Sequence, residues 1–186
     1  MDLSEAYRSI ARRYFPAALV VADRLHVVRL ALHHLMKTCC QIDPGLLYRR
    51  GASSLLQKHA HNLTMNQAGR LKTYLDSQPA VARIYDFKEE LMVVLTAKRQ
   101  TKDQCRILAY RLLDAIRQLR QSPFEDCQKL GRTLEAWQAE IGRMWRFSRS
   151  NGITEGFHRK MKLIQRRAFG FRNFDNYRRR VGALCV

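Results

Sequence analysis

The chain has 186 residues and a formal net charge of +18 at pH 7, because 34 Lys and Arg outnumber 16 Asp and Glu. A chain of this length can form one hydrophobic core, and so large a positive charge indicates a polyanionic partner. The longest apolar run, Ala17–Ala22, is much shorter than the ~20 residues that span a bilayer. Residues 1–9 show no apolar secretory segment. We therefore expect a cytoplasmic protein with no membrane partner.

The first stretch of the chain predicts an amphipathic helix. Leu3–Phe15 has the helical period of apolar residues, and Pro16 ends it. Arg8, Arg12 and Arg13 are expected to face away from the core. The stripe expected to face the core consists of Leu3, Ala6, Tyr7, Ile10, Ala11 and Tyr14.

A short apolar run follows at Ala18–Ala22. Its length and β-branched centre are typical of a buried strand with helices on both faces. Asp23 ends this run, and a helix that carries His26 follows at once. Active sites of open α/β sheets gather at the carboxyl ends of strands, so Asp23 is a candidate site residue. For His26, a core or capping role is the alternative.

Residues 46–147 predict only helices, which we interpret as an all-α insertion. Thr101 suits a helix cap, and Pro79 and Pro123 suit first helical positions. Trp137 and Trp145 are expected in the core, with stacking on an unpaired base as the alternative. The expected helices are Leu46–His61, Thr64–Ser77, Pro79–Lys98, Lys102–Gln121 and Phe124–Arg146.

The cysteines and histidines show no metal-site pattern. Five cysteines occur without Cys-x-x-Cys spacing, so reduced and mostly buried thiols are expected. The pairs His33–His34 and His59–His61 have no acidic or Cys companions at ligand spacing. We expect no metal role for either pair.

Positive charge is concentrated at residues 146–180, where eleven Lys and Arg oppose two acids for a net charge of +9. Ser150 and Asn151 suit a helix start. At about 100° per residue, the helix would separate two faces. The apolar face comprises Ile153, Phe157, Met161, Ile164 and Ala168, and the opposite face comprises Asn151, Glu155, Arg159, Lys162 and Arg166.

The acid on this cationic face has two interpretations. Glu155 and Arg159 are spaced i, i+4, and such a surface ion pair is worth only a few tenths of a kcal/mol. The alternative is a functional carboxylate beside cations that bind phosphates.

Two sets of residues, one near each end of the chain, form extended motifs. The C-terminal set is Ser150-Asn151-Gly152-x-x-Glu155-Gly156, Lys162-Leu163-Ile164, Arg166-Arg167-Ala168 and Gly170-Phe171-Arg172. The N-terminal set is Asp2-Leu3-Ser4, Tyr7, Phe15-Pro16-x-Ala18 and Val21-x-Asp23-Arg24-x-His26-Val27-Val28. Both sets resemble the signatures of one family, the ISL-three family of bacterial insertion-sequence transposases. Two departures are His158, where the family usually has Asn, and Leu25, where it commonly has Phe.

The resemblance implies a DDE recombinase that cleaves phosphodiesters and transfers DNA strands with metal ions. Asp2 and Glu155 match two of the three catalytic acids, which would also be ligands of Mg²⁺ or Mn²⁺. Asp23, His26 and Asn151 match accessory positions. The residues expected to bind DNA at the transposon ends are Arg159, Lys162, Arg166, Arg167, Arg172, Arg178, Arg179 and Arg180.

The resemblance also implies a mostly α chain with a small α/β part, which is a partial RNase H-like fold interrupted by the all-α insertion. We expect an α/β segment at residues 1–40, the insertion at 41–147 and the Glu155 helix with its basic segment at 148–186. The family's first catalytic Asp has no counterpart, so we interpret the chain as a C-terminal part of a transposase. A two-ion site and activity are expected only in the complete protein, through self-association or the missing N-terminal half. The alternative function is a non-catalytic DNA-binding fragment or a regulator of transposition.

Overall fold

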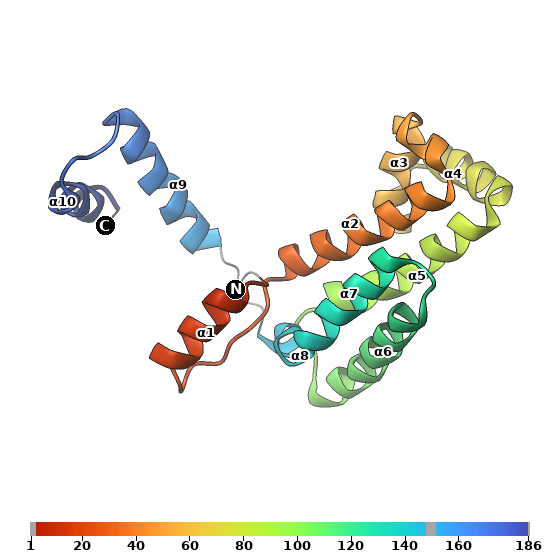
Figure 1. Ribbon diagram of the computed structural model, residues 1–186, viewed down its shortest axis with the longest axis horizontal. Coiled ribbons are helices and arrows are strands. Elements are labelled where there is room, and N and C mark those ends of the chain that lie inside the picture. The colour runs from red at the N-terminus through yellow and green to blue at the C-terminus, as the bar shows by residue number, and fades with distance from the viewer. Residues whose placement is uncertain (1–2, 148–151, 186) are drawn as a thin grey trace. The chain divides into compact units, whose positions relative to one another are not determined.

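The computed structural model describes residues 3–147 and 152–185, and for residues 50, 152–155 and 185 it describes the backbone alone. The chain forms two compact units, Met1–Ser148 and Arg149–Val186. In the described ranges all regular structure is helical, as Figure 1 shows, and there is no strand. The prediction of a mostly α protein is therefore confirmed.

Long helices of the first unit pack side by side. Helix α2 lies against α5 and α7, and α6 lies against α7 (Figure 1). Short elements between α2 and α5 pack on the far end of α2. The elements are α1 (Glu5–Tyr14), α2 (Arg24–Ile42), η1 (Pro44–Leu47), α3 (Arg50–Gln57), η2 (Ala60–Asn62), α4 (Met65–Ser77), α5 (Pro79–Thr96), α6 (Lys102–Gln121), α7 (Glu125–Ala136) and α8 (Gln138–Arg146).

Side-chain caps fix where several helices begin. The predicted cap Thr101 starts α6, where its hydroxyl accepts the Gln104 backbone N–H while the Gln104 side chain accepts the Thr101 N–H. Thr64 and Gln67 form the same capping box at α4. Each box satisfies two backbone donors that a helix start otherwise leaves unpaired. Pro79 occupies the first turn of α5, as predicted.

The core of the first unit forms around the α2, α5, α6, α7 and α8 helices. Both tryptophans are buried there, and the Trp145 indole Nε1–H donates to the Val94 carbonyl at 2.9 Å. The expectation of core tryptophans is confirmed, and base stacking by them is wrong. Cys39 is buried as well, and burial raises the pKa of its thiol to about 12, so that this thiol stays protonated at neutral pH.

The strand predicted at Ala18–Ala22 is wrong. These residues form no ladder, and Leu19 is 61% exposed. A strand needs a partner strand for its backbone groups, and helix α8 supplies other partners here. The Ala22 N–H donates to the Glu140 carbonyl at 3.1 Å, and the Arg143 guanidinium donates to the Val20 carbonyl at 3.0 Å.

Helix α1 differs in part from its predicted pattern: Arg12 and Arg13 are exposed as expected, but so are the large apolar side chains. Tyr7, Ile10 and Tyr14 are 50–63% exposed, and no residue of α1 is buried. Arg8, expected to face away, points inward to the buried Glu140. Leaving the buried Glu140 carboxylate without a partner would cost about 3–5 kcal/mol. Burying one large apolar side chain gains only about 1.5–3 kcal/mol, so the face with Arg8 turns inward.

Two predicted long helices are each interrupted. Phe124–Arg146 divides at Trp137, whose backbone leaves the helical region while its ring is buried under the Arg8 guanidinium. Leu46–His61 becomes two 3₁₀ turns around α3, which ends where Lys88 Nζ donates to the Leu56 and Lys58 carbonyls. Pro123 precedes the cap of α7 instead of occupying its first position.

Candidate nucleic-acid interface

The second unit consists of two helices, α9 (Gly152–Arg167) and α10 (Phe174–Cys185), which pack on each other. Among the described side chains of α9, Ile164 is buried, and Met161 and Ala168 on the same side are half-buried. Phe157, predicted on this stripe, is 44% exposed. The apolar stripe of α9 therefore faces its partner helix along only part of its length.

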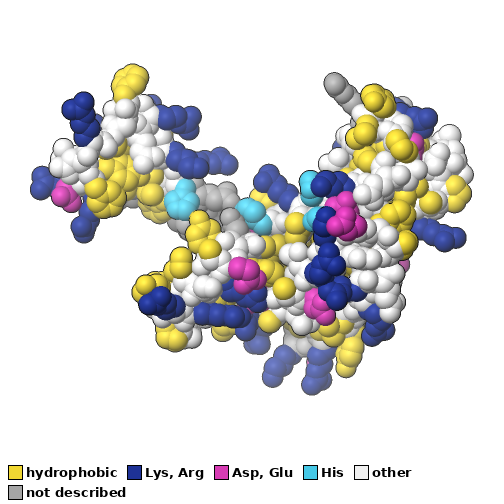
Figure 2. All heavy atoms as spheres, viewed as in Figure 1, with side chains coloured by type: hydrophobic (Ala, Val, Ile, Leu, Met, Phe, Trp, Pro, Cys, Tyr) yellow, Lys and Arg dark blue, Asp and Glu magenta, His cyan; other side chains and the backbone are white. Residues whose placement is uncertain are grey.

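The opposite face of α9 is cationic. Arg159, Lys162 and Arg166 are exposed, and helical spacing places position 155 in line with them. Lys160 and Arg167 are exposed beside this row. Figure 2 shows the Lys and Arg side chains projecting from the surface of this unit.

Aromatic contacts hold the start of α10. The Phe171 and Tyr177 ring centroids lie 5.2 Å apart, and those of Phe174 and Tyr177 lie 6.2 Å apart. The Arg180 guanidinium lies 5.7 Å from the Phe171 ring centroid. The three neighbouring cations Arg172, Arg178 and Arg179 are exposed.

The cations of this unit lack acidic partners among the described side chains. Asp175 is the one carboxylate described there, and no ion pair joins it to a Lys or Arg of the described unit. Clustered surface cations with few nearby carboxylates create a positive electrostatic potential that attracts anions from solution. All eight predicted DNA-binding residues are exposed in this unit, seven of them on the two helices and Arg172 in the connection between them.

The structure describes little of the predicted catalytic acids. Asp2 and Asn151 lie outside the described residues, and Glu155 lies in the first turns of α9 with only its backbone described. The predicted distance between the Asp2 and Glu155 carboxylates therefore stays a prediction. No group of three His, Cys, Asp or Glu in the described part of the chain could hold a metal ion.

Asp23 and His26 do lie together, at the start of α2. Asp23 Oδ1 accepts the Leu25 backbone N–H at 2.8 Å and lies 3.5 Å from His26 Nδ1. Asp23 therefore caps α2, which is a structural task for this carboxylate. Arg24 ties the same helix end to its neighbours by donating to the Ala97 and Met144 carbonyls. Burial lowers the pKa of Arg24.

Sequence reasoning missed the cluster around Glu140. This carboxylate is only 2% exposed, and its Oε1 lies 3.1 Å from Arg8 Nε and 3.5 Å from Arg12 Nη2. The available signal was an acid on the apolar face of a helix, since Glu140 follows the buried Trp137 by three residues and precedes the buried Met144 by four. Separately from this carboxylate, the Glu140 backbone carbonyl and the Arg143 side chain hold residues 20–22, which precede Asp23.

The transposase family model of the ISL-three group matches residues 1–181. This chain belongs to that transposase family. The match spans nearly all of both units and includes the basic helices α9 and α10. No curated protein and no solved structure matches the chain.

None of the described helices of this transposase is both long and apolar enough to cross a membrane.

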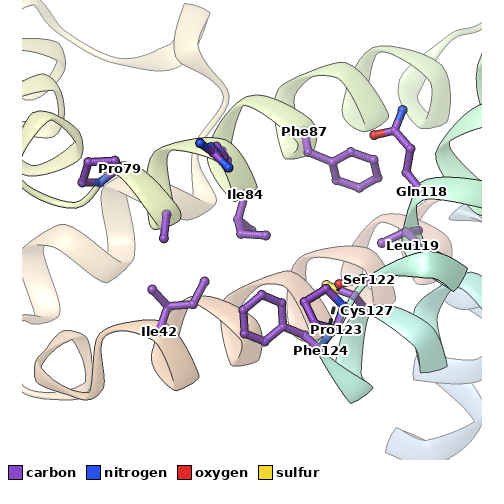
Figure 3. Close-up of a pocket in the computed structure, with 12 residues that line it drawn as sticks. Ile42, Pro79, Ile84, Phe87, Gln118, Leu119, Ser122, Pro123, Phe124 and Cys127 are labelled. Atoms are coloured by element: carbon purple, nitrogen blue, oxygen red, sulfur yellow. Dashed lines mark hydrogen bonds between the residues drawn. The ribbon is translucent and has the colours of Figure 1, made fainter.

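The first unit also contains a groove. An apolar groove of about 600 Å³ lies between α2, α5 and the α6–α7 turn, where Figure 3 shows Ile42, Ile84 and Phe124 around the opening. Its lining contains Arg83 and Gln118 but no carboxylate, so it lacks the donors of a two-metal site.

Proposed function

We propose that this chain acts in DNA transposition as a part of a DDE recombinase, and that α9 and α10 hold the DNA of the transposon ends. The observation that carries the proposal is the exposed cationic surface of α9 and α10, whose described side chains include a single carboxylate. Lys and Arg on such a surface neutralise phosphates and release condensed counterions, which favours binding without reading the base sequence.

The catalytic part of the proposal rests on the family and on two acids. Asp2 and Glu155 would hold Mg²⁺ or Mn²⁺, both of which favour carboxylate oxygens. Two such ions would stabilise the attacking and leaving oxygens of a phosphodiester. The position of Glu155 on the cationic face of α9 supports this assignment, since phosphates held by Arg159 and Lys162 would lie beside it.

The RNase H-like fold remains a proposal in which the present helices complete a sheet supplied by another segment or chain. The exposed Tyr7, Ile10 and Tyr14 of α1 and the exposed Leu19 support it, because such apolar surface is expected to be covered in an assembled domain. Self-association is one way to cover it. We also propose that the chain divides into an α/β segment at residues 1–40, an all-α insertion at 41–147 and a C-terminal segment at 148–186. A cytoplasmic location is likewise a proposal.

The direct test is binding of the full chain to fluorescent duplex DNA of mixed sequence over a series of salt concentrations. We expect the logarithm of the binding constant to fall steeply and linearly with the logarithm of salt concentration. Binding that does not depend on salt, or no binding to duplex DNA, would contradict the proposal.

A further inference from the structure

Phe169 follows helix α9 in an unusual backbone conformation. Its φ is +50°, which is the left-handed region. The Phe169 N–H donates to the Arg166 carbonyl at 3.2 Å, and the Gly170 N–H donates to the Gln165 carbonyl at 3.1 Å. These two bonds form a Schellman turn, in which Phe169 occupies the position that normally favours glycine.

The Phe169 side chain is also fully exposed, at 100%. The ring therefore loses the stabilisation that burial gives an aromatic side chain, and the turn itself would be less strained with glycine. Phe171 and Phe174 of the same unit contact Tyr177, whereas Phe169 has no ring contact among the described residues. Neither packing nor turn geometry explains a phenylalanine here. Strained residues of this kind gather at functional sites.

The surroundings of the ring indicate its ligand. Phe169 lines a shallow hollow of about 460 Å³ together with Lys162, Gln165, Arg166 and Gly170. An aromatic face beside two cations suits a nucleotide, since the ring can stack on the base while the cations hold adjacent phosphates. The Gln165 amide can donate to and accept from a base edge. A paired base in a duplex is already stacked on both faces, so the ring needs an unpaired one.

We propose that Phe169 stacks on an unpaired DNA base while Lys162 and Arg166 hold the flanking phosphates. This inference rests on the proposed DNA-binding function of α9 and α10. It assigns to the turn after α9 a preference for DNA with an unpaired nucleotide over fully paired DNA. The stacking is sequence-tolerant because every base has a π face.

The test uses the full chain and two DNA probes of equal length, a paired duplex and a duplex with one unpaired 2-aminopurine. We expect about tenfold tighter binding to the unpaired probe, with quenching of its fluorescence by stacking. Phe169→Ala should abolish both the preference and the protein-induced quenching while binding of the paired duplex stays within about twofold.

Three further variants separate stacking from other effects. Phe169→Trp should retain the preference and the quenching, and Phe169→Leu, which keeps an apolar side chain without a ring, should lose both. Phe157→Ala is the matched control, because it removes another exposed ring of this unit, one without a ring contact among the described residues, and it should retain the preference. Circular dichroism checks that each variant keeps its helices.

The outcomes separate this inference from the proposed function. If wild type shows salt-dependent binding of the paired duplex but no preference for the unpaired probe, the stacking role of Phe169 is wrong and the DNA-binding proposal stands. A preference that survives in Phe169→Leu also overturns the stacking role. If neither probe binds, both proposals fail.

Discussion

The Nε atom of Arg8 lies 3.1 Å from Oε1 of Glu140, and this ion pair joins two helices that are 132 residues apart in the chain. The Glu140 side chain is 2% exposed and that of Arg8 is 11% exposed, so the pair is largely removed from water. Arg8 also donates to the Ala136 carbonyl at 2.7 Å and stacks over the Trp137 ring. One side chain thus attaches α1 to both α7 and α8.

Replacing Arg8 with Ala should destabilise the first unit by about 3 kcal/mol, because the buried Glu140 carboxylate would lose its closest partner. Chemical denaturation in urea, followed by circular dichroism, measures this loss. Arg12→Ala is the matched control: its side chain is 65% exposed and 3.5 Å from the same carboxylate, so it should cost less than about 1 kcal/mol. Equal losses in the two variants would contradict this account of Arg8.

Asp126 should make stability depend on acid pH. Its Oδ1 lies 3.0 Å from His34 Nδ1, and this hydrogen bond holds the pKa of Asp126 below its ordinary value of 3.8. A carboxyl with a lowered folded-state pKa stabilises fully above the ordinary value and loses that stabilisation as the pH falls through the folded-state pKa. The stability difference between wild type and Asp126→Asn should therefore be largest at neutral pH and shrink below about pH 4.

Urea denaturation at several pH values measures this dependence. Asp114→Asn is the control, because Asp114 is 56% exposed and its partners, Arg117 and Gln118, lie on the same surface helix. The control should show a small difference from wild type that hardly changes with pH. A constant difference for Asp126→Asn across the whole range would disprove the assignment.

The double replacement of Lys162 and Arg166 with Gln should weaken binding to duplex DNA and lower the slope of log K against log salt by about one to two units. The matched control is Lys72→Gln with Arg132→Gln, which removes the same charge from exposed positions of the first unit. Its slope should stay close to that of wild type. If both double variants lower the slope equally, the DNA surface is not confined to α9 and α10.

Glu155 and Asp2 should bind the same metal ions in the complete protein when DNA is present. In an Mn²⁺ titration of the complete, DNA-bound protein by electron paramagnetic resonance, Glu155→Gln and Asp2→Asn should each lower Mn²⁺ affinity by about tenfold or more. Because the ligands share a site, the double variant should lose less than the sum of the two single losses. Asp175→Asn, in the same basic unit, serves as the control. Unchanged Mn²⁺ affinity in Glu155→Gln would refute its role as a ligand.

Local chemistry explains the parts of the fold that the sequence predicted well. Helix α6 begins at the predicted Lys102 because the Thr101 capping box is complete within four residues. It ends at the predicted Gln121, where the C-cap Ser122 precedes Pro123 and has an extended backbone. The amphipathic pattern of α9 likewise predicted a buried Ile164 opposite exposed cations. The interactions that cap α6 lie within four residues of one another along the chain. The two faces of α9 follow from the burial of apolar side chains alone.

Distant partners decided the parts that were predicted wrongly. Whether Ala18–Ala22 becomes a strand depends on a second strand, and the backbone there binds α8 instead.

The sequence by itself determined the helical class, the helix caps, the cationic face of α9 and the membership of a transposase family, because these depend on residue type and short spacing. Only the tertiary structure decided which side of α1 faces inward and that the predicted helix Phe124–Arg146 is interrupted at Trp137. It also decided that Asp23 caps a helix instead of ending a strand. The reason is that a buried charge such as Glu140 selects its partner by position in space, and that partner lies 132 residues away in the sequence.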